Sequence, residues 1–211
     1  MRRISLVILL LAGQLQTTLS GQSRSPAEKS AVGLKCGPIA DQLFKCPKFG
    51  FTVRVPFGWV DRTDDMQGKS ESAADGSVRQ ATEQGSQVLL AVFEHPPEVV
   101  ADTINSAIVI SSERLASYPG IKSAADYLGP ITDLARERGF TAAGEPYPFS
   151  VGTRRLIRAD FSREQGKLTM WQSSLVMIEN HSIVSFTFIA GSDEETDDLV
   201  EQLSFSPPKP K

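Results

Sequence analysis

Alternating apolar and polar side chains recur along the chain and predict β-strands joined by short polar links. The clearest pair is 43–47 and 51–56, separated by the Gly-containing link Lys48-Phe49-Gly50. Two such runs around a short link are typical of a β-hairpin. Further strands are predicted at residues 78–82, 87–94, 103–115, 144–149, 153–161, 167–179 and 183–190.

Two segments are less regular than the rest. The run at 103–115 also fits helical spacing through Ile104, Ile108 and Leu115, but its β-branched residues favour a strand. Residues 61–77 are dense in Asp, Ser, Gly and Lys. We therefore expect a long solvated loop there, and loops on a rigid scaffold are favourable places for a contact surface.

Helical patterns occur once in the middle of the chain and once near its end. Ser123 with Asp126 fits a capping box for a helix over 123–138, which Gly139 ends. Pro130 inside this segment predicts a kink or a second short helix starting there, because an interior proline costs about 3 kcal/mol. A second capping box, at Ser192 and Glu195, predicts a final helix with Leu199, Val200 and Leu203 facing inward.

The last predicted strand shows how the elements are layered. Val184, Phe186, Phe188 and Ala190 share one face, while Ile183 and Ile189 keep the opposite face partly apolar. A sheet with two apolar faces needs cover on both sides. Strands joined by hairpins, with two helices, therefore predict an α+β fold with a mainly antiparallel sheet.

The first residues have the order of a secretory signal, with Arg2 and Arg3 followed by an apolar run over 4–12. That run has about nine residues, roughly half the length of a membrane-spanning helix. Gln14 stands where a lipoprotein box would need cysteine, so no stable membrane anchor is expected. The chain is expected to divide into a signal peptide (1–20), a flexible lead (21–35), a single domain (36–206) and a Pro-rich tail (207–211).

Composition narrows the class of protein. Of 211 residues, 40% are hydrophobic and 22% are charged, which excludes a disordered chain, a collagen or a coiled coil. The formal net charge is −3, and loss of Arg2 and Arg3 with the signal makes it more negative. A negative net charge gives no overall electrostatic attraction for nucleic acid, so no nucleic-acid partner is expected.

Cys36 and Cys46 are the only cysteines of the chain. Export places them where thiols oxidise, so we expect a structural disulfide between them. Closing a loop of this size stabilises a domain by roughly 3 kcal/mol. Free thiols are the alternative, and a metal site would need more ligands than two cysteines.

The motif Phe51-x-Val53-x-Val55-Pro56-x-Gly58-Trp59 precedes a strand and a helix, and then a three-strand meander. The meander ends in Ser185-Phe186-Thr187-Phe188-x-Ala190 and leads into a short acidic helix and Leu203-x-Phe205. Over roughly residues 44–205 this order resembles the PsbP-like fold family. The resemblance implies an α/β/α sandwich around an antiparallel sheet and a role as a binding or accessory module. No metal or partner site of the photosystem members can be matched onto this chain.

Catalytic chemistry has few candidates. Only His95 and His181 could act as bases near neutral pH, and His181 falls in a predicted tight turn. His95 is near Glu94, Glu98 and Asp102, but two intervening prolines and the lack of a second histidine disfavour a metal site there. The chain has no nucleophile elbow and no phosphate-binding glycine loop. The sequence therefore predicts no catalytic residue, no metal site and no cofactor.

Charged and aromatic residues leave alternatives open. Positive charge gathers on one predicted hairpin, at Arg154, Arg155, Arg158, Arg163 and Lys167. Arg154 and Arg158 share a strand face with Asp160, which favours a solvated, partly paired face over an anion or partner contact. Acids gather at the start of the last helix, where the helix dipole favours them or where they could form a docking patch: Asp193, Glu194, Glu195, Asp197 and Asp198. Trp59 and Trp171 are expected to pack rather than to form a recognition cage.

These observations favour an exported, soluble, non-catalytic module, periplasmic or extracellular, that contacts an unknown protein or envelope partner. The first alternative is a carrier of a small apolar molecule between sheet and helix, which would need a cavity lined by Phe186, Phe188, Trp171 or Leu134. The second is a hydrolase, which would need a cleft holding His95 close to a serine and an acid.

Overall fold

The computed structural model describes residues 35–72, 86–99 and 102–206, and all of them belong to one compact unit. The predicted signal peptide, most of the flexible lead, the predicted strand at 78–82 and the Pro-rich tail lie outside the described residues. Within the described part, every strand pair is antiparallel, which confirms an α+β fold with antiparallel sheets.

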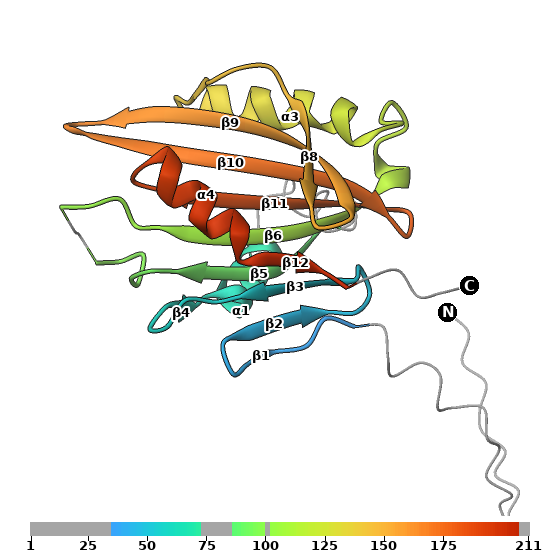
Figure 1. Ribbon diagram of the computed structural model, residues 1–211, viewed down its shortest axis with the longest axis horizontal. Helices are drawn as coiled ribbons and strands as arrows, with labels where there is room; N and C mark the ends of the chain where they lie inside the picture. The colour runs from blue at the N-terminus through green and yellow to red at the C-terminus, as the bar shows by residue number, and fades with distance from the viewer. Residues whose placement is uncertain (1–34, 73–85, 100–101, 207–211) are drawn as a thin grey trace, which may run out of the picture. The chain divides into compact units, whose positions relative to one another are not determined.

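The larger sheet has the strand order β4-β5-β6-β11-β10-β9-β7, with β8 also paired to β9 (Figure 1). Its long strands form the predicted meander, because only short links separate them. Its strands are β4 (Val60–Asp61), β5 (Gln87–Phe93), β6 (Ala107–Arg114), β7 (Thr141–Ala142), β8 (Tyr147–Val151), β9 (Arg154–Gln165), β10 (Leu168–Glu179) and β11 (Ser182–Ala190). The ambiguous run at 103–115 is therefore a strand, as expected.

A second, smaller sheet has the order β1-β2-β3-β12. It contains the predicted hairpin and recruits the end of the chain beside it: β1 (Ile39–Ala40), β2 (Leu43–Cys46), β3 (Phe51–Arg54) and β12 (Leu203–Phe205). Phe205 lies opposite Phe51, so the first and last strands of the domain share one sheet.

Alternate side chains of the larger sheet enter two different apolar clusters. On β10, Leu175 and Met177 join the cluster that includes the small sheet and α4 (Asp193–Glu201). Val176 points the other way, into the cluster that includes α3 (Ala124–Glu137). The predicted cover on both faces is confirmed (Figure 1). The resemblance implied helices on both faces, but on one face the small sheet shares this role with α4.

Helix α3 begins as the sequence predicts. The Ser123 side chain accepts a hydrogen bond from the Asp126 N–H, and the Asp126 carboxylate accepts one from the Ser123 N–H. Pro130 lies inside one continuous helix, so the expectation of a second helix starting there was wrong. Pro130 is exposed, and its ring therefore displaces no packed neighbour. Helix α4 has the Ser192 cap, but Glu195 accepts from the Gly191 N–H rather than from Ser192. The expectation that Leu203 lies on this helix was wrong, because the helix ends at Glu201 and Leu203 is buried in β12 instead.

The expected loop over 61–77 was wrong in its first part, which forms α1 (Thr63–Ser72). The helix has almost no apolar residues, so hydrophobic periodicity does not reveal it. It is held instead by polar contacts: Asp61 Oδ1 accepts from the Thr63 N–H at 2.9 Å, and Gln67 Nε2 donates to the Val88 carbonyl of β5 at 2.6 Å. Smaller differences occur at β8, which begins at Tyr147 rather than at 144, and at β9, which continues to Gln165 rather than ending at 161.

Candidate functional site

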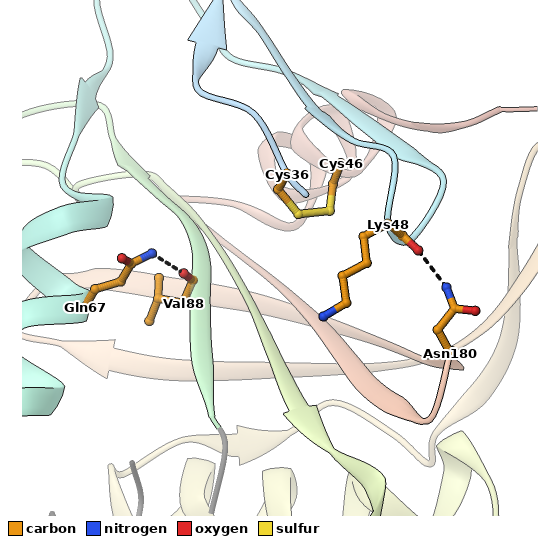
Figure 2. Close-up of a disulfide and its surroundings, with 6 residues drawn as sticks. All are labelled: Cys36, Cys46, Lys48, Gln67, Val88 and Asn180. Atoms are coloured by element: carbon orange, nitrogen blue, oxygen red, sulfur yellow. Dashed lines mark hydrogen bonds between the residues drawn. A yellow bond between two sulfur atoms is a disulfide. The ribbon is translucent and has the colours of Figure 1, made fainter. Parts of the chain in front are cut away.

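The two histidines do not come together. His181 and Asn180 form the tight turn between β10 and β11, with φ values of +58° and +50°. Both values are typical of the type I′ turns that join antiparallel strands, so the prediction of a turn role is confirmed. Asn180 also donates a hydrogen bond to the Lys48 carbonyl at 2.6 Å, and this contact ties the turn to the link between β2 and β3 (Figure 2).

His95 is held by its backbone rather than by its ring. Asn105 Oδ1 accepts from the His95 N–H, and Asn105 Nδ2 donates to the His95 carbonyl, both at 2.9 Å. The ring lies 3.7 Å from Glu94, while Glu98 pairs with Arg62 at 3.0 Å. Among the described residues, no three His, Cys, Asp or Glu side chains gather in a way that could hold a metal ion.

The basic residues of the β9–β10 hairpin differ in their partners and in their exposure. Arg154 pairs with Glu179 at 2.9 Å and lies over the Phe205 ring. Arg163 donates to the Arg138 carbonyl at 3.0 Å. Arg155 and Lys167 are exposed, whereas Arg158 is buried, with 7% of its surface accessible. The expected partly paired face is therefore present, and Arg158 is its exceptional member.

Arg158 lies at a pocket where three strands and a helix meet. On β9, Arg158 and Asp160 point to the same face, and β10 places Ser173 opposite Asp160. Tyr147 of β8 lies opposite Arg158. The first turns of α4 close the pocket, which has a volume of about 270 Å³. We call it the Arg158 pocket, and it is lined by Ala143, Tyr147, Arg158, Asp160, Trp171, Gln172, Ser173, Asp193, Thr196 and Asp197.

A dense set of hydrogen bonds fixes the floor of this pocket. Arg158 Nε donates to Asp160 Oδ1 at 2.8 Å. Arg158 Nη2 donates to Asp197 Oδ1 at 2.6 Å and to Ser173 Oγ at 2.8 Å. Asp160 also accepts from the hydroxyls of Ser173, at 2.5 Å, and Tyr147, at 2.9 Å. The guanidinium lies over the Phe149 ring, so both its edge and its face are constrained.

The same contacts shift the pKa values of two groups. Burial raises the pKa of Tyr147 to about 12, and its hydrogen bond to Asp160 adds to the increase. Burial by itself would lower the pKa of Arg158, but hydrogen bonds to Asp160 and Asp197 outweigh it and raise that pKa. Both shifts lead away from neutral pH, so these two groups keep their protons while they position the pocket.

A larger groove, of about 540 Å³, lies beside the disulfide of Cys36 and Cys46. Figure 2 shows Lys48 beside this region, with Gln67 and Val88 of the α1–β5 contact across from it. The linings of both the groove and the Arg158 pocket consist of described residues. The Arg158 pocket in addition contains a buried arginine held by three hydrogen bonds, so we take that pocket as the candidate site.

The four side chains expected to line a carrier's apolar cavity lie in different surroundings. Phe186 and Phe188 are fully buried in the packed cluster, and Leu134 is 47% exposed. Trp171 lines the polar Arg158 pocket instead, while Trp59 packs against the core as expected. None of the helices among the described residues has the length and apolar character needed to span a membrane.

Comparisons with known proteins give structural matches only. No family model and no curated protein matches the sequence. Among solved structures, cyanobacterial PsbP from Synechocystis matches with a TM-score of 0.48 and 11% identity, over 82% of this chain and 98% of that one. LpqN, involved in cell envelope biogenesis of Mycobacterium tuberculosis, matches at 0.36 and 13%, over 74% and 83%. The Ran-binding protein Mog1p of Saccharomyces cerevisiae matches at 0.38 and 11%, over 74% and 80%. One of these matches is a PsbP protein, as the sequence resemblance named, but at these identities and TM-scores no function of this chain follows from them.

The sequence drew attention to charged residues that line the pocket but did not predict a pocket, because it favoured a solvated, partly paired strand face and an acidic helix start. Arg158 and Asp160 were placed on one strand face, whereas Asp197 and Trp171 were interpreted separately. Tyr147 and Ser173 were missed. Tyr147 comes from a strand whose predicted bounds were displaced toward the N-terminus, and a lone serine in a strand carries no pattern of its own.

Proposed function

We propose that this domain is an exported, non-catalytic binding module that contacts a protein or an envelope component through the Arg158 pocket. The observation that carries the proposal is the rigid, polar floor of the pocket, in which Arg158 is held by Asp160, Ser173 and Asp197. A recognition site gains affinity when its polar groups are ordered before the ligand arrives.

The absence of an assigned catalytic role is part of the proposal. A general acid or base works best when its pKa is close to the working pH. The pKa shifts of Tyr147 and Arg158 lead in the other direction. Export is supported by the disulfide, since such bonds persist in oxidising compartments.

Binding is tested by site-specific photo-cross-linking in the native cell. A photoreactive residue replaces Ala143, which is exposed at the pocket, and in a matched control it replaces Lys45, which is exposed on β2. We expect one macromolecule to be captured from position 143 and not from 45. The same capture is expected to disappear in a Trp171→Ala background. Equal capture from both positions, or capture that survives Trp171→Ala, would contradict the proposal.

Export is tested by sequencing the N-terminus of the protein that the cell accumulates. Cleavage after Ser20 is expected to leave Gly21 as the first residue. A protein that keeps Met1 and stays in the cytoplasm would contradict this part of the proposal.

A further inference from the structure

Several polar groups of the Arg158 pocket have unused hydrogen-bonding capacity. Arg158 uses Nε and Nη2, and its Nη1 has no hydrogen-bond partner within the described residues. The indole N–H of Trp171 also has none there. On the acceptor side, Asp197 binds Arg158 through Oδ1 only, and the Asp193 carboxylate makes no hydrogen bond in the described part of the chain.

These groups are open to the pocket. Among the described residues, Arg62 Nε is the only buried side-chain nitrogen or oxygen atom without a hydrogen-bond partner. Arg158 Nη1 and Trp171 Nε1 are therefore accessible to solvent. Because Arg158 is 93% buried, the pocket that it lines is the route by which a ligand reaches its free N–H groups.

The free groups of the Arg158 pocket are of both kinds. Two donors, from Arg158 and Trp171, and two carboxylate acceptors, from Asp193 and Asp197, line the same pocket. Trp171 and Tyr147 add ring surfaces that suit the C–H face of a partly apolar ligand. The volume of about 270 Å³ has room for one six-membered ring with its substituents.

We propose that the Arg158 pocket binds the pyranose ring of an uncharged sugar. A hydroxyl group both donates and accepts, so a ring with several hydroxyls can use the Arg158 and Trp171 donors and the Asp193 and Asp197 acceptors together. An anion would meet three carboxylates, from Asp160, Asp193 and Asp197, whereas a cation could pair with these carboxylates but would leave the Arg158 and Trp171 donors unused. The inference rests on the proposed function, because it names the ligand of the same site.

The two tryptophans of the chain provide a direct test. In a nitrogen-15 correlation spectrum each indole N–H gives one signal. The signal that disappears in Trp171→Phe belongs to Trp171, and the remaining one belongs to Trp59. The protein is expressed from its complete coding sequence and taken in the form that the cell accumulates. It is titrated with the methyl glycosides of glucose, galactose, mannose and N-acetylglucosamine, and with cellotetraose and chitotetraose. Tetramethylammonium chloride and sodium sulfate serve as cation and anion probes.

We expect at least one sugar to shift the Trp171 indole signal and the Ala143 amide signal saturably, while the Trp59 indole signal stays in place. The salts are expected to move neither signal. A tetrasaccharide that binds about tenfold more tightly than its methyl glycoside would identify a polysaccharide as the source of the ring. Equal affinities would identify a free sugar.

Variants separate the pocket from general charge effects. Trp171→Ala and Asp193→Asn are each expected to weaken sugar binding at least about tenfold, as measured at the Ala143 amide. Glu194→Gln removes the same charge one residue along α4 at an exposed position that does not line the pocket, and it is expected to leave binding unchanged. Circular dichroism of each variant confirms that it folds.

Failure of the inference can be distinguished from failure of the proposed function. If no sugar shifts the Trp171 signal while cross-linking from position 143 still captures one Trp171-dependent macromolecule, the sugar inference is overturned and the binding module stands. If the salts alone shift the signal, the ligand is an ion and the inference is likewise overturned. If neither experiment finds a ligand, both are wrong.

Discussion

At the scale of single residues, Arg158 is the buried cation of the candidate site and donates hydrogen bonds to Asp160, Ser173 and Asp197. Its side chain is 9% exposed and pairs with Asp160, which is 21% exposed, and with Asp197, which is 61% exposed. Buried ion pairs contribute little net stability, but removal of one partner leaves the other charge uncompensated. Arg158 therefore serves to position its neighbours.

Replacing Arg158 with alanine is expected to lower the free energy of unfolding by about 3–5 kcal/mol, because Asp160 would lose its charged partner. Urea denaturation followed by circular dichroism measures the change. Arg155→Ala is the matched control, since Arg155 is exposed on the same strand, and it is expected to change stability by less than about 0.5 kcal/mol. Similar losses in the two variants would show that Arg158 has no special role.

The tyrosines provide a second residue-scale feature, because the pKa of each of the three is raised. Tyr118 and Tyr127 both donate to the Glu113 carboxylate of β6, with Tyr127 at 2.8 Å from it. Burial is the largest cause for both, and it raises the pKa of Tyr118 to about 12.

Stability is therefore expected to fall as pH rises from about 10 to 12. In this range the unfolded chain has released tyrosine protons that the native state still holds, so deprotonation favours unfolding. Below pH 10 this stabilising contribution is complete. Ultraviolet absorbance measures tyrosinate directly, and its appearance in native protein is expected at higher pH than in urea. Coincident titration curves would disprove the raised pKa values.

At the scale of elements, helix ends were predictable where they depend on nearby residues. Ser123 and Asp126 are three positions apart, and the sequence alone identified their capping box. Helix α1 had no such pattern, since its position depends on the contact of Gln67 with β5, 21 residues away. Local signals in the sequence thus predict where α3 and α4 begin, but not the existence of α1 or the end of α4 at Glu201.

The capping box gives an element-scale prediction. Ser123→Ala is expected to lower the free energy of unfolding by about 1 kcal/mol, because the Asp126 N–H loses its acceptor. Thermal or urea denaturation measures the loss. Ser123→Asp keeps a capping oxygen and is expected to retain most of the stability. Equal destabilisation by the two changes would argue against a capping role.

At the scale of the whole molecule, the disulfide fixes the beginning of the domain to its small sheet. Cys46 is fully buried at the end of β2, and Cys36 packs against the same apolar cluster. The link restrains the segment that leads into β1, which has only two residues of its own in the sheet.

Reduction is expected to destabilise the domain by about 3 kcal/mol or less and to leave it folded, because the larger sheet does not depend on the link. Calorimetry with and without reductant measures the shift in melting temperature. Cys36→Ser is expected to have the melting temperature of the reduced protein both with and without reductant. An equal melting temperature with and without reductant would contradict the bridge.

Patterns along the chain predict the strands of the meander, the two capped helices, the antiparallel class and the disulfide pair. These features depend on alternation, capping and compartment, which are properties of neighbouring residues or of composition. The second sheet, α1 and the Arg158 pocket follow only from the folded arrangement. Tyr147, Arg158, Trp171 and Asp197 come from four elements, and only the register of β8, β9 and β10 together with the crossing of α4 brings them together. Such convergence depends on long-range packing, which no local pattern encodes.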